Sequence, residues 1–254
     1  MNLLHVVYSH QEEVNAWKKN DTRFIETDAV KYLWDHLQTN NSIHITGLPG
    51  VGKTLTLHHI ALQLRDTQGY IIIPCCRPAD IPLHFRKGRN IVFVVDDICG
   101  KFTIDENEVR EWKKYISEKL SILKSGRIKI LTSNRYSVFQ DHRFRVLEVF
   151  SEHFCDLSFG SYCITVLEKE KIANEYLPKD VFEKIKRHIG QMDCFPLMCQ
   201  QYTIRPITDA LMFFSNPFDI FEKEIFAMKE DDKLKFCALF ICVLLNGCVG
   251  CGHK

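Results

Sequence analysis

The stretch that decides the fold is Gly47–Thr54, which is GLPGVGKT. It fits the pattern of a glycine, four residues and Gly-Lys-Thr, which forms a loop that wraps a polyphosphate in backbone N–H groups. We expect Lys53 to lie between the β- and γ-phosphates and the Thr54 hydroxyl to ligate Mg²⁺. The residues predicted to contact a nucleotide here are Gly47, Leu48, Pro49, Gly50, Val51, Gly52, Lys53, Thr54 and Leu55.

The residues on either side of this loop favour the same site. Ser42–Thr46 indicates a short strand that runs into the loop, and a helical period of mostly apolar residues runs out of it through Leu57, Ile60 and Leu64. A helix that begins at the loop adds its dipole to the anion site. The order of strand, loop and helix therefore favours a nucleotide site over a glycine-rich surface loop.

A second nucleotide motif lies at residues 90–97. The apolar run Asn90–Val95 predicts a buried strand, and it ends in Asp96 and Asp97, where carboxylates would face the phosphates. We assign Asp96 to Mg²⁺ and Asp97 to the attacking water, which makes Asp97 and Lys53 the predicted catalytic residues. The run Asp97–Gly100 also fits the Asp-x-x-Gly of GTPases, but the chain has no Asn-Lys-x-Asp motif for guanine, so ATP and ADP are preferred.

The order of the remaining strands predicts how the sheet is arranged. Residues 70–74 and 127–132 are strand candidates, and a long amphipathic helix is expected between them at about 105–124. The later strand is expected to insert between the two motif strands, in a parallel P-loop NTPase sheet of the ASCE type with helices on both faces. Its tip carries Arg135, which either contacts the γ-phosphate or simply caps an exposed strand end. Residues 144–150 are a candidate last strand.

The C-terminal third is predicted to be helical. Thr165–Glu168 fits a capping box, which opens a helix that runs to about residue 177. A second helix is expected from about residue 179, and further helical stretches follow. We expect a linker at 1–21, a nucleotide-binding domain at 22–160, a helical lid at 161–205 and a further unit at 206–254.

An apolar segment, Phe24–Thr27, lies just upstream of the phosphate strand. In this fold class such a segment can cover the base of the nucleotide, which makes Phe24, Ile25 and Thr27 candidate base contacts. A strand packed against the sheet edge explains the same residues equally well.

The bulk composition excludes several classes of protein. The 254 residues carry a formal net charge of +1, which argues against a nucleic-acid binder that uses a broad basic face. The 11 cysteines, without a secretion signal, favour reduced thiols in the cytoplasm, and the neighbouring pair Cys75 and Cys76 is interpreted as packing. The longest apolar run, residues 236–245, is too short to span a membrane.

The chain resembles the STAND class of signalling NTPases and, within it, the novel STAND NTPase 3 domain of large animal proteins, several of them immune-receptor-like. The resemblance rests on residues 24–27 and 47–54 and on the following stretches: VFVVDDICGKF at 92–102, LTSNR at 131–135, CFPLMC at 194–199 and NPFDIFEKE at 216–224. It implies an ATP-operated switch in which Pro196 packs near the adenine. It also implies that residues 206–254 open a winged-helix-like unit, and that the ATP state associates with other protein domains or with itself.

Three functions are compatible with these residues. The first is a STAND-type switch that binds Mg–ATP or Mg–ADP and hydrolyses ATP slowly, in signalling of the innate-immune kind. The second is a P-loop kinase for a small molecule, although residues 161–205 offer only Arg187 and Arg205 to contact phosphates. The third is a non-catalytic interaction module that holds nucleotide for stability.

Overall fold

The computed structural model describes residues 3–123, 127–192, 194–204, 210–215 and 218–244. The chain divides into two compact units, residues 1–206 and 207–254, and each is described by itself. The strands of the first unit are β1 (Ser42–Gly47), β2 (Ile71–Pro74), β3 (Ile91–Val95), β4 (Ile128–Arg135) and β5 (Phe154–Asp156). Its helices are α1 (Leu3–Asp21), α2 (Asp28–Thr39), α3 (Lys53–Gln68), α4 (Asp80–His84), α5 (Glu106–Leu123), α6 (Tyr136–Phe139), η1 (Phe144–Val146), α7 (Glu148–Ser151), α8 (Val166–Tyr176), α9 (Lys179–Ile185), η2 (Lys186–Gln191) and α10 (Phe195–Ile204).

The strands form one parallel sheet in the order β2-β3-β4-β1-β5. The strand that follows the second motif, β4, therefore lies between β1 and β3, as the sequence predicts. The register pairs Gly47 with Arg135, so the tip of β4 lies beside the start of the phosphate loop. The chain thus has the fold of a P-loop NTPase of the ASCE type.

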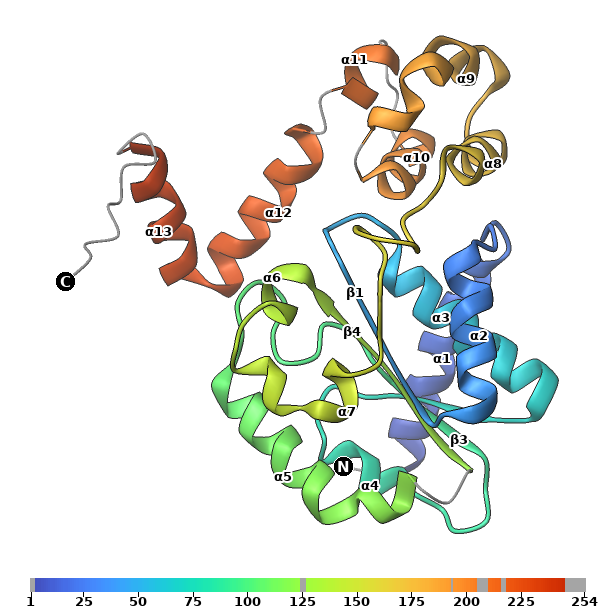
Figure 1. Cartoon of the computed structure of the whole chain (residues 1–254), viewed down its shortest axis with the longest axis vertical. Coiled ribbons are helices and arrows are strands. Elements are labelled where there is room, and N and C mark those ends of the chain that lie inside the picture. Colours follow the sequence, from blue (N-terminus) through green and yellow to red (C-terminus); the bar gives the residue numbers. More distant parts are fainter. Residues whose placement is uncertain (1–2, 124–126, 193, 205–209, 216–217, 245–254) are drawn as a thin grey trace. The chain divides into compact units, whose positions relative to one another are not determined.

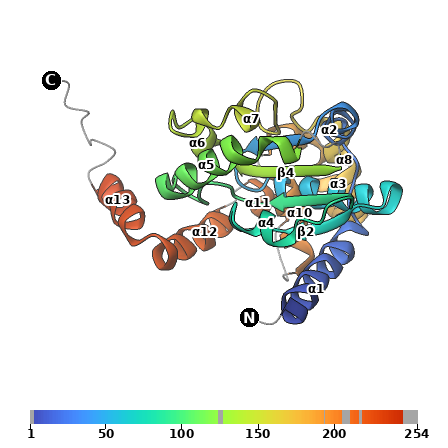
Figure 2. The same ribbon diagram turned by 90° about the horizontal axis from the view of Figure 1, so that it is seen from below.

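Helices cover both faces of the sheet (Figures 1 and 2). On one face, Ile43 and Ile45 of β1 pack with Leu57 and Ile60 of α3, in a core that α1 and α2 also join. On the other face, β3 and β4 pack against α5, α6 and α7 around Trp112. Parallel strands buried on both faces are apolar throughout, and the IVFVV sequence of β3 shows this pattern.

The prediction of a strand at residues 144–150 is wrong. This stretch forms η1 and α7, and the last strand of the sheet is β5. Phe144, Leu147 and Phe150 are buried whereas Val146 is 43% exposed, so the buried positions recur every third residue. That period belongs to a tight helical turn, while a strand with one buried face would bury every second residue.

The segment expected to be a linker forms α1 instead. Val14 and Trp17 of this helix are buried in the core beneath α3. Asp21, its last residue, pairs with His59 of α3 at 2.8 Å between Oδ1 and Nδ1. Packing against α3 thus orders a helix whose polar residues give a weak amphipathic signal in the sequence.

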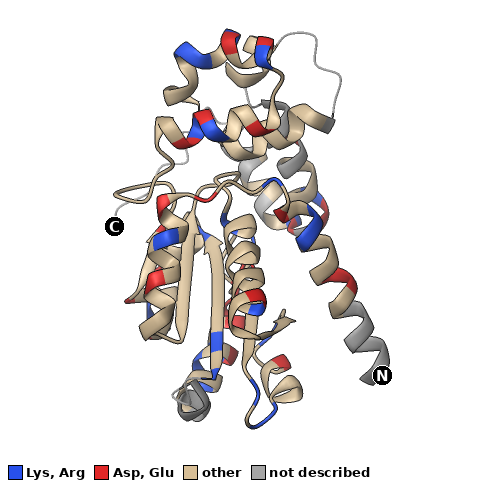
Figure 3. Ribbon diagram, turned by 90° about the vertical axis from the view of Figure 1, so that its right-hand side faces the viewer, with Lys and Arg blue, Asp and Glu red and all other residues tan. Residues whose placement is uncertain are grey.

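Charges of both signs are interspersed along the helices in the view of Figure 3, in keeping with the net charge of +1. The second unit contains α11 (Ala210–Ser215), α12 (Phe218–Asp231) and α13 (Lys233–Leu244). Its winged-helix-like character stays a prediction. Within the described residues, no helix is both long enough and apolar enough to span a membrane.

Candidate nucleotide-binding site

The phosphate loop joins the end of β1 to the start of α3. Gly52 is the residue before the helix and has φ +99°, and no heavy atom lies within 4 Å of the place that a Cβ would take there. A phosphate oxygen can therefore approach this part of the backbone, next to the positive end of the α3 dipole. The geometry of the loop fits a bound polyphosphate.

Lys53 is the first residue of α3, and its side chain turns back over the loop. It is 8% exposed, and its Nζ donates to the carbonyl oxygens of Gly47 at 3.0 Å and Leu48 at 2.9 Å. The Leu48 amide in turn donates to the Ser158 hydroxyl at 2.6 Å, although the Leu48 side chain is exposed. The ammonium group is thus held at the concave side of the loop, where phosphates would lie.

The predicted magnesium ligands meet directly. The Thr54 hydroxyl donates to Oδ2 of Asp96 at 2.7 Å, and the Ser133 hydroxyl donates to the other carboxylate oxygen. Hydroxyl and carboxylate oxygens are the donors that Mg²⁺ prefers, and it usually takes only one or two protein ligands beside the phosphates. The donor set of Thr54 and Asp96 therefore fits Mg²⁺.

Asp97 has an unusual backbone and a perturbed carboxyl group. Its φ is +52°, and its amide donates to Oδ1 of Asp96 at 3.2 Å. Burial and the neighbouring Asp96 charge raise the pKa of Asp97 to about 6, although Arg135 and Lys53 act in the opposite direction. A carboxyl group with a pKa near neutrality is suited to accept a proton from water.

Arg135 lies at the tip of β4, close enough to Asp97 for its charge to lower the pKa of that carboxyl group. Its guanidinium also lies over the Phe102 ring, 4.5 Å from the centroid. The register places it beside Gly47. The structure thus brings Arg135 to the phosphate loop and the acid pair.

Several of the predicted nucleotide contacts line a small apolar pocket beside the loop. They come from three parts of the chain and are Phe24, Ile25, Thr27, Val51, Gly52, Leu55 and Pro196. Ile172 and Tyr176 of α8 also line it. The cavity holds about 40 Å³, room for a few water molecules rather than a purine ring. Its walls must therefore separate to admit a base.

The helices after residue 161 contact the phosphate loop itself. The Cys194 thiol donates to the Pro49 carbonyl at 3.0 Å, and the Leu197 amide donates to the Gly50 carbonyl at 3.3 Å. A Cβ on Gly50, which has φ +77°, would lie 2.9 Å from the Cys194 Cβ. Glycine at this position thus permits α10 to pack directly on the loop. We call residues 161–205 the lid, of which residues 193 and 205 are not described.

A family model described as "Novel STAND NTPase 3" matches residues 24–179, which is more than half of the chain. The chain belongs to the novel STAND NTPase 3 family. The match begins at Phe24, on the wall of the apolar pocket, and includes both phosphate motifs and the tip of β4.

Solved structures similar to this STAND NTPase include AMPPCP-bound DnaA from Aquifex aeolicus, with 15% identity and a TM-score of 0.46 over 82% of this chain and 70% of that one. Domain III of DnaA from Thermotoga maritima has 14% identity and a TM-score of 0.46, over 72% and 85%. The RuvB Holliday junction branch migration motor from Thermotoga maritima has 14% identity and a TM-score of 0.43, over 85% and 75%. No curated protein is significantly similar to the chain.

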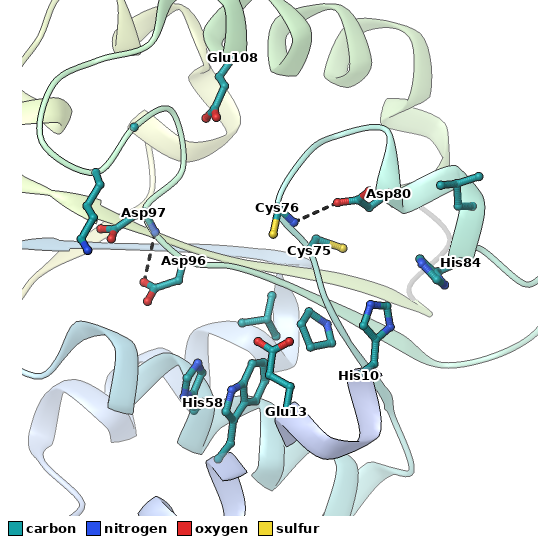
Figure 4. Close-up of a pocket in the computed structure, with 16 residues that line it drawn as sticks. His10, Glu13, His58, Cys75, Cys76, Asp80, His84, Asp96, Asp97 and Glu108 are labelled. Atoms are coloured by element: carbon teal, nitrogen blue, oxygen red, sulfur yellow. Dashed lines mark hydrogen bonds between the residues drawn. The ribbon is translucent and has the colours of Figure 1, made fainter. Parts of the chain in front are cut away.

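A larger cleft of about 880 Å³ opens beside the acid pair of this STAND NTPase (Figure 4). Asp96 and Asp97 lie at one end, and His10 and His84 lie at the other, with their rings 4.9 Å apart. His58 lines the cleft and stacks on Trp17 of α1 at 3.8 Å between centroids. α1 therefore forms part of the wall that faces the acids.

The neighbouring cysteines also line this cleft. Burial raises the pKa of the Cys75 thiol, and the Cys76 amide donates to the Asp80 carboxylate at 3.0 Å. Within the described part of the chain, no cluster of three or more His, Cys, Asp or Glu residues has the arrangement of a metal site.

Two residues of the site have roles that the sequence does not predict. Ser133 bonds Asp96, and its place in the polar end of β4, Thr132–Arg135, is the signal that could have found it. Glu168 is predicted only as a capping-box residue, and the structure adds a bond to the backbone of Asp28. That second partner lies 140 residues away in the chain, so no local pattern indicates it.

Proposed function

We propose that the chain is an ATP-operated signalling switch of the STAND type. It binds Mg–ATP and Mg–ADP, hydrolyses ATP slowly, and uses the nucleotide state to set the position of the lid. In the ATP state it associates with itself or with other protein domains, in cytoplasmic signalling of the innate-immune kind. Family membership and the geometry of the phosphate loop support the nucleotide-binding part of this proposal.

The observation that carries the proposal is the direct packing of the lid on the phosphate loop. Cys194 and Leu197 bond to the carbonyl oxygens of Pro49 and Gly50. Residues of both the core and the lid also line the apolar pocket. A ligand that fills the pocket and the loop therefore interacts differently with an open and a closed lid, and a ligand shifts a conformational equilibrium only through such a difference.

Each residue has a role in this proposal. Lys53 and the loop backbone bind the phosphates, and Thr54 and Asp96 hold Mg²⁺. Asp97 orients and deprotonates the attacking water, and Arg135 contacts the γ-phosphate. The base lies between Phe24, Ile25, Thr27 and Leu55 on the core side and Pro196 on the lid side.

The direct test is to identify the nucleotide that copurifies with the protein. Denaturing the protein and chromatographing the supernatant should release ADP in near-equal amount to the protein. Single-turnover ATP hydrolysis should then be measured for the wild type and for Asp97→Asn. The switch requires slow but measurable turnover in the wild type and less in the variant, whereas equal, near-zero rates favour a non-catalytic module.

A small-molecule kinase is the second candidate, and the 880 Å³ cleft favours it because Asp97 lies on its wall. An acceptor hydroxyl in this cleft would lie beside a carboxyl group suited to take its proton. Of the two lid arginines, Arg187 is exposed, and Arg205 lies outside the described residues. Transfer of phosphate from ATP to an added nucleoside or sugar would support the kinase over the switch.

A further inference from the structure

Glu168, in the first turn of α8, is a buried carboxylate with partners on two different parts of the chain. It is 6% exposed, and a glutamate is rarely buried to this degree unless it is paired. Its Oε2 accepts from the Thr165 amide at 2.7 Å and from the Thr165 hydroxyl at 2.8 Å. The amide bond, with the bond from the Glu168 amide to the Thr165 hydroxyl at 3.3 Å, forms the capping box of α8. The capping box therefore accounts for one of its two oxygens.

The other oxygen of Glu168 holds the start of α2. Oε1 accepts from the Asp28 amide at 2.7 Å. Thr27 is in the N-cap position of α2, but its side chain makes no capping bond. The lid thus supplies the acceptor that the first turn of α2 lacks, and one carboxylate caps two helices.

A second link ties the same segment to α8. Nε of Arg23 donates to the Glu175 carboxylate at 3.2 Å, and its guanidinium lies over the Tyr176 ring at 4.3 Å. Arg23 and Asp28 are the two ends of residues 23–28, which carry Phe24, Ile25 and Thr27 on the pocket wall. We call residues 23–28 the base segment.

The contacts on α8 follow the period of a helix. Glu168, Ile172 and Glu175–Tyr176 are separated by three or four residues, so they lie on one face. Ile172 and Tyr176 line the same pocket as the base segment. One face of α8 therefore holds both ends of the base segment and supplies the opposite wall between them.

We propose that Glu168 is a positioning residue that fixes the base segment to the lid and so sets nucleotide affinity through the base. This inference rests on the proposed nucleotide binding. The hydrogen bonds of Glu168 to Asp28 and Thr165 lie outside the phosphate loop, so its effect should be confined to the part of the ligand beyond the phosphates.

The test compares two ligands, ADP and inorganic pyrophosphate, by calorimetry on the full chain with Mg²⁺. Glu168→Ala should weaken ADP binding about tenfold or more, because hydrogen bonds to a charged group are among the stronger ones. Pyrophosphate binding should stay unchanged. Glu168→Gln keeps one carbonyl oxygen that can accept from Asp28, so it should recover part of the ADP affinity while pyrophosphate again stays constant.

Glu175→Ala is the second variant, and it does not depend on removing a buried group, since the Glu175 side chain is 41% exposed. It loosens the other end of the base segment and should weaken ADP binding about two- to threefold, the scale of an exposed ion pair, without affecting pyrophosphate. Equal losses for ADP and pyrophosphate would overturn the inference, as would unchanged ADP binding in Glu168→Ala or, should that variant not fold, in Glu175→Ala. A wild type that binds pyrophosphate but not ADP would overturn it too, while one that binds neither refutes the proposed function itself.

Discussion

Replacing Gly50 by alanine tests the packing of the lid on the phosphate loop. Gly50 has φ +77°, and a Cβ there would lie 2.9 Å from the Cys194 Cβ and 3.1 Å from the Cβ and Cδ2 of Leu197. The backbone sets the positions of both Cβ atoms, the one added to Gly50 and that of Cys194, and Cys194 itself has φ +52°. Rotation of a side chain therefore cannot relieve the contact with Cys194.

Gly69 provides a matched control. It ends α3 with φ +67°, and no heavy atom lies within 4 Å of the place that its Cβ would take. Gly69→Ala should therefore cost only the left-handed backbone, about 1–2 kcal/mol of unfolding free energy. Gly50→Ala carries the same cost plus about 1–3 kcal/mol for overpacking, so we expect a total of about 2–5 kcal/mol.

The measurement is urea unfolding of the full chain, followed by circular dichroism, for both variants and the wild type. Cys194→Gly in the Gly50→Ala background removes the colliding Cβ and suits a positive φ, so the double variant should recover part of the loss. If Gly50→Ala costs no more than Gly69→Ala, the lid does not pack on the loop in solution and the reasoning fails.

Three further predictions concern the site and its core. Lys53→Ala should weaken ADP binding about 10- to 100-fold in calorimetry, because we expect the ammonium group to contact the phosphates, and unchanged affinity would exclude the proposed nucleotide site. Thr54→Ala should reduce the gain in ATP affinity on adding Mg²⁺, since it removes one of the two proposed protein ligands; a full gain would show that Thr54 is not a ligand. Burial lowers the pKa of His44 from 6.5 to about 3, so the unfolded chain binds a proton between these values that the folded chain does not. The contribution of His44 to the free energy of unfolding should be fully present above pH 6.5 and be lost as the pH falls below it. At pH 5 this loss should be about 2 kcal/mol. Urea unfolding of His44→Gln should show a smaller loss between pH 7.5 and pH 5 than the wild type, and equal losses would contradict this assignment.

The sequence predicts the core of the site because the two phosphate motifs are local. Each is a short run with a fixed chemical order, and each follows an apolar strand, so the roles of Lys53, Thr54 and Asp96 can be inferred from the residues alone. The place of β4 between β1 and β3 also follows from the order of motifs and strands. Each phosphate motif can be recognised because its residues lie within a few positions of one another in the chain.

The features that the sequence does not predict depend on partners far apart in the chain, or on a burial period of three residues that the apolar sequence does not reveal. Phe24–Thr27 forms no strand and lines the apolar pocket, which its residues alone do not decide, and its contact with a base stays a prediction. The second partner of Glu168 lies far along the chain. Residues 144–150 are apolar enough for a strand, and only the burial of every third side chain identifies tight helical turns.

The insertion of β4 has a consequence for how the chain is made. Ser42 of β1 pairs with Ile130 of β4, a separation of 88 residues, and the partners of β1 in β5 come later still. At about 5–20 residues per second, a ribosome needs roughly 4–18 seconds to extend the chain from one strand to the other. Until then, Ile43 and Ile45 of β1 can be covered only by helices made before β4, such as α2 and α3. We therefore expect the centre of the sheet to close late in synthesis.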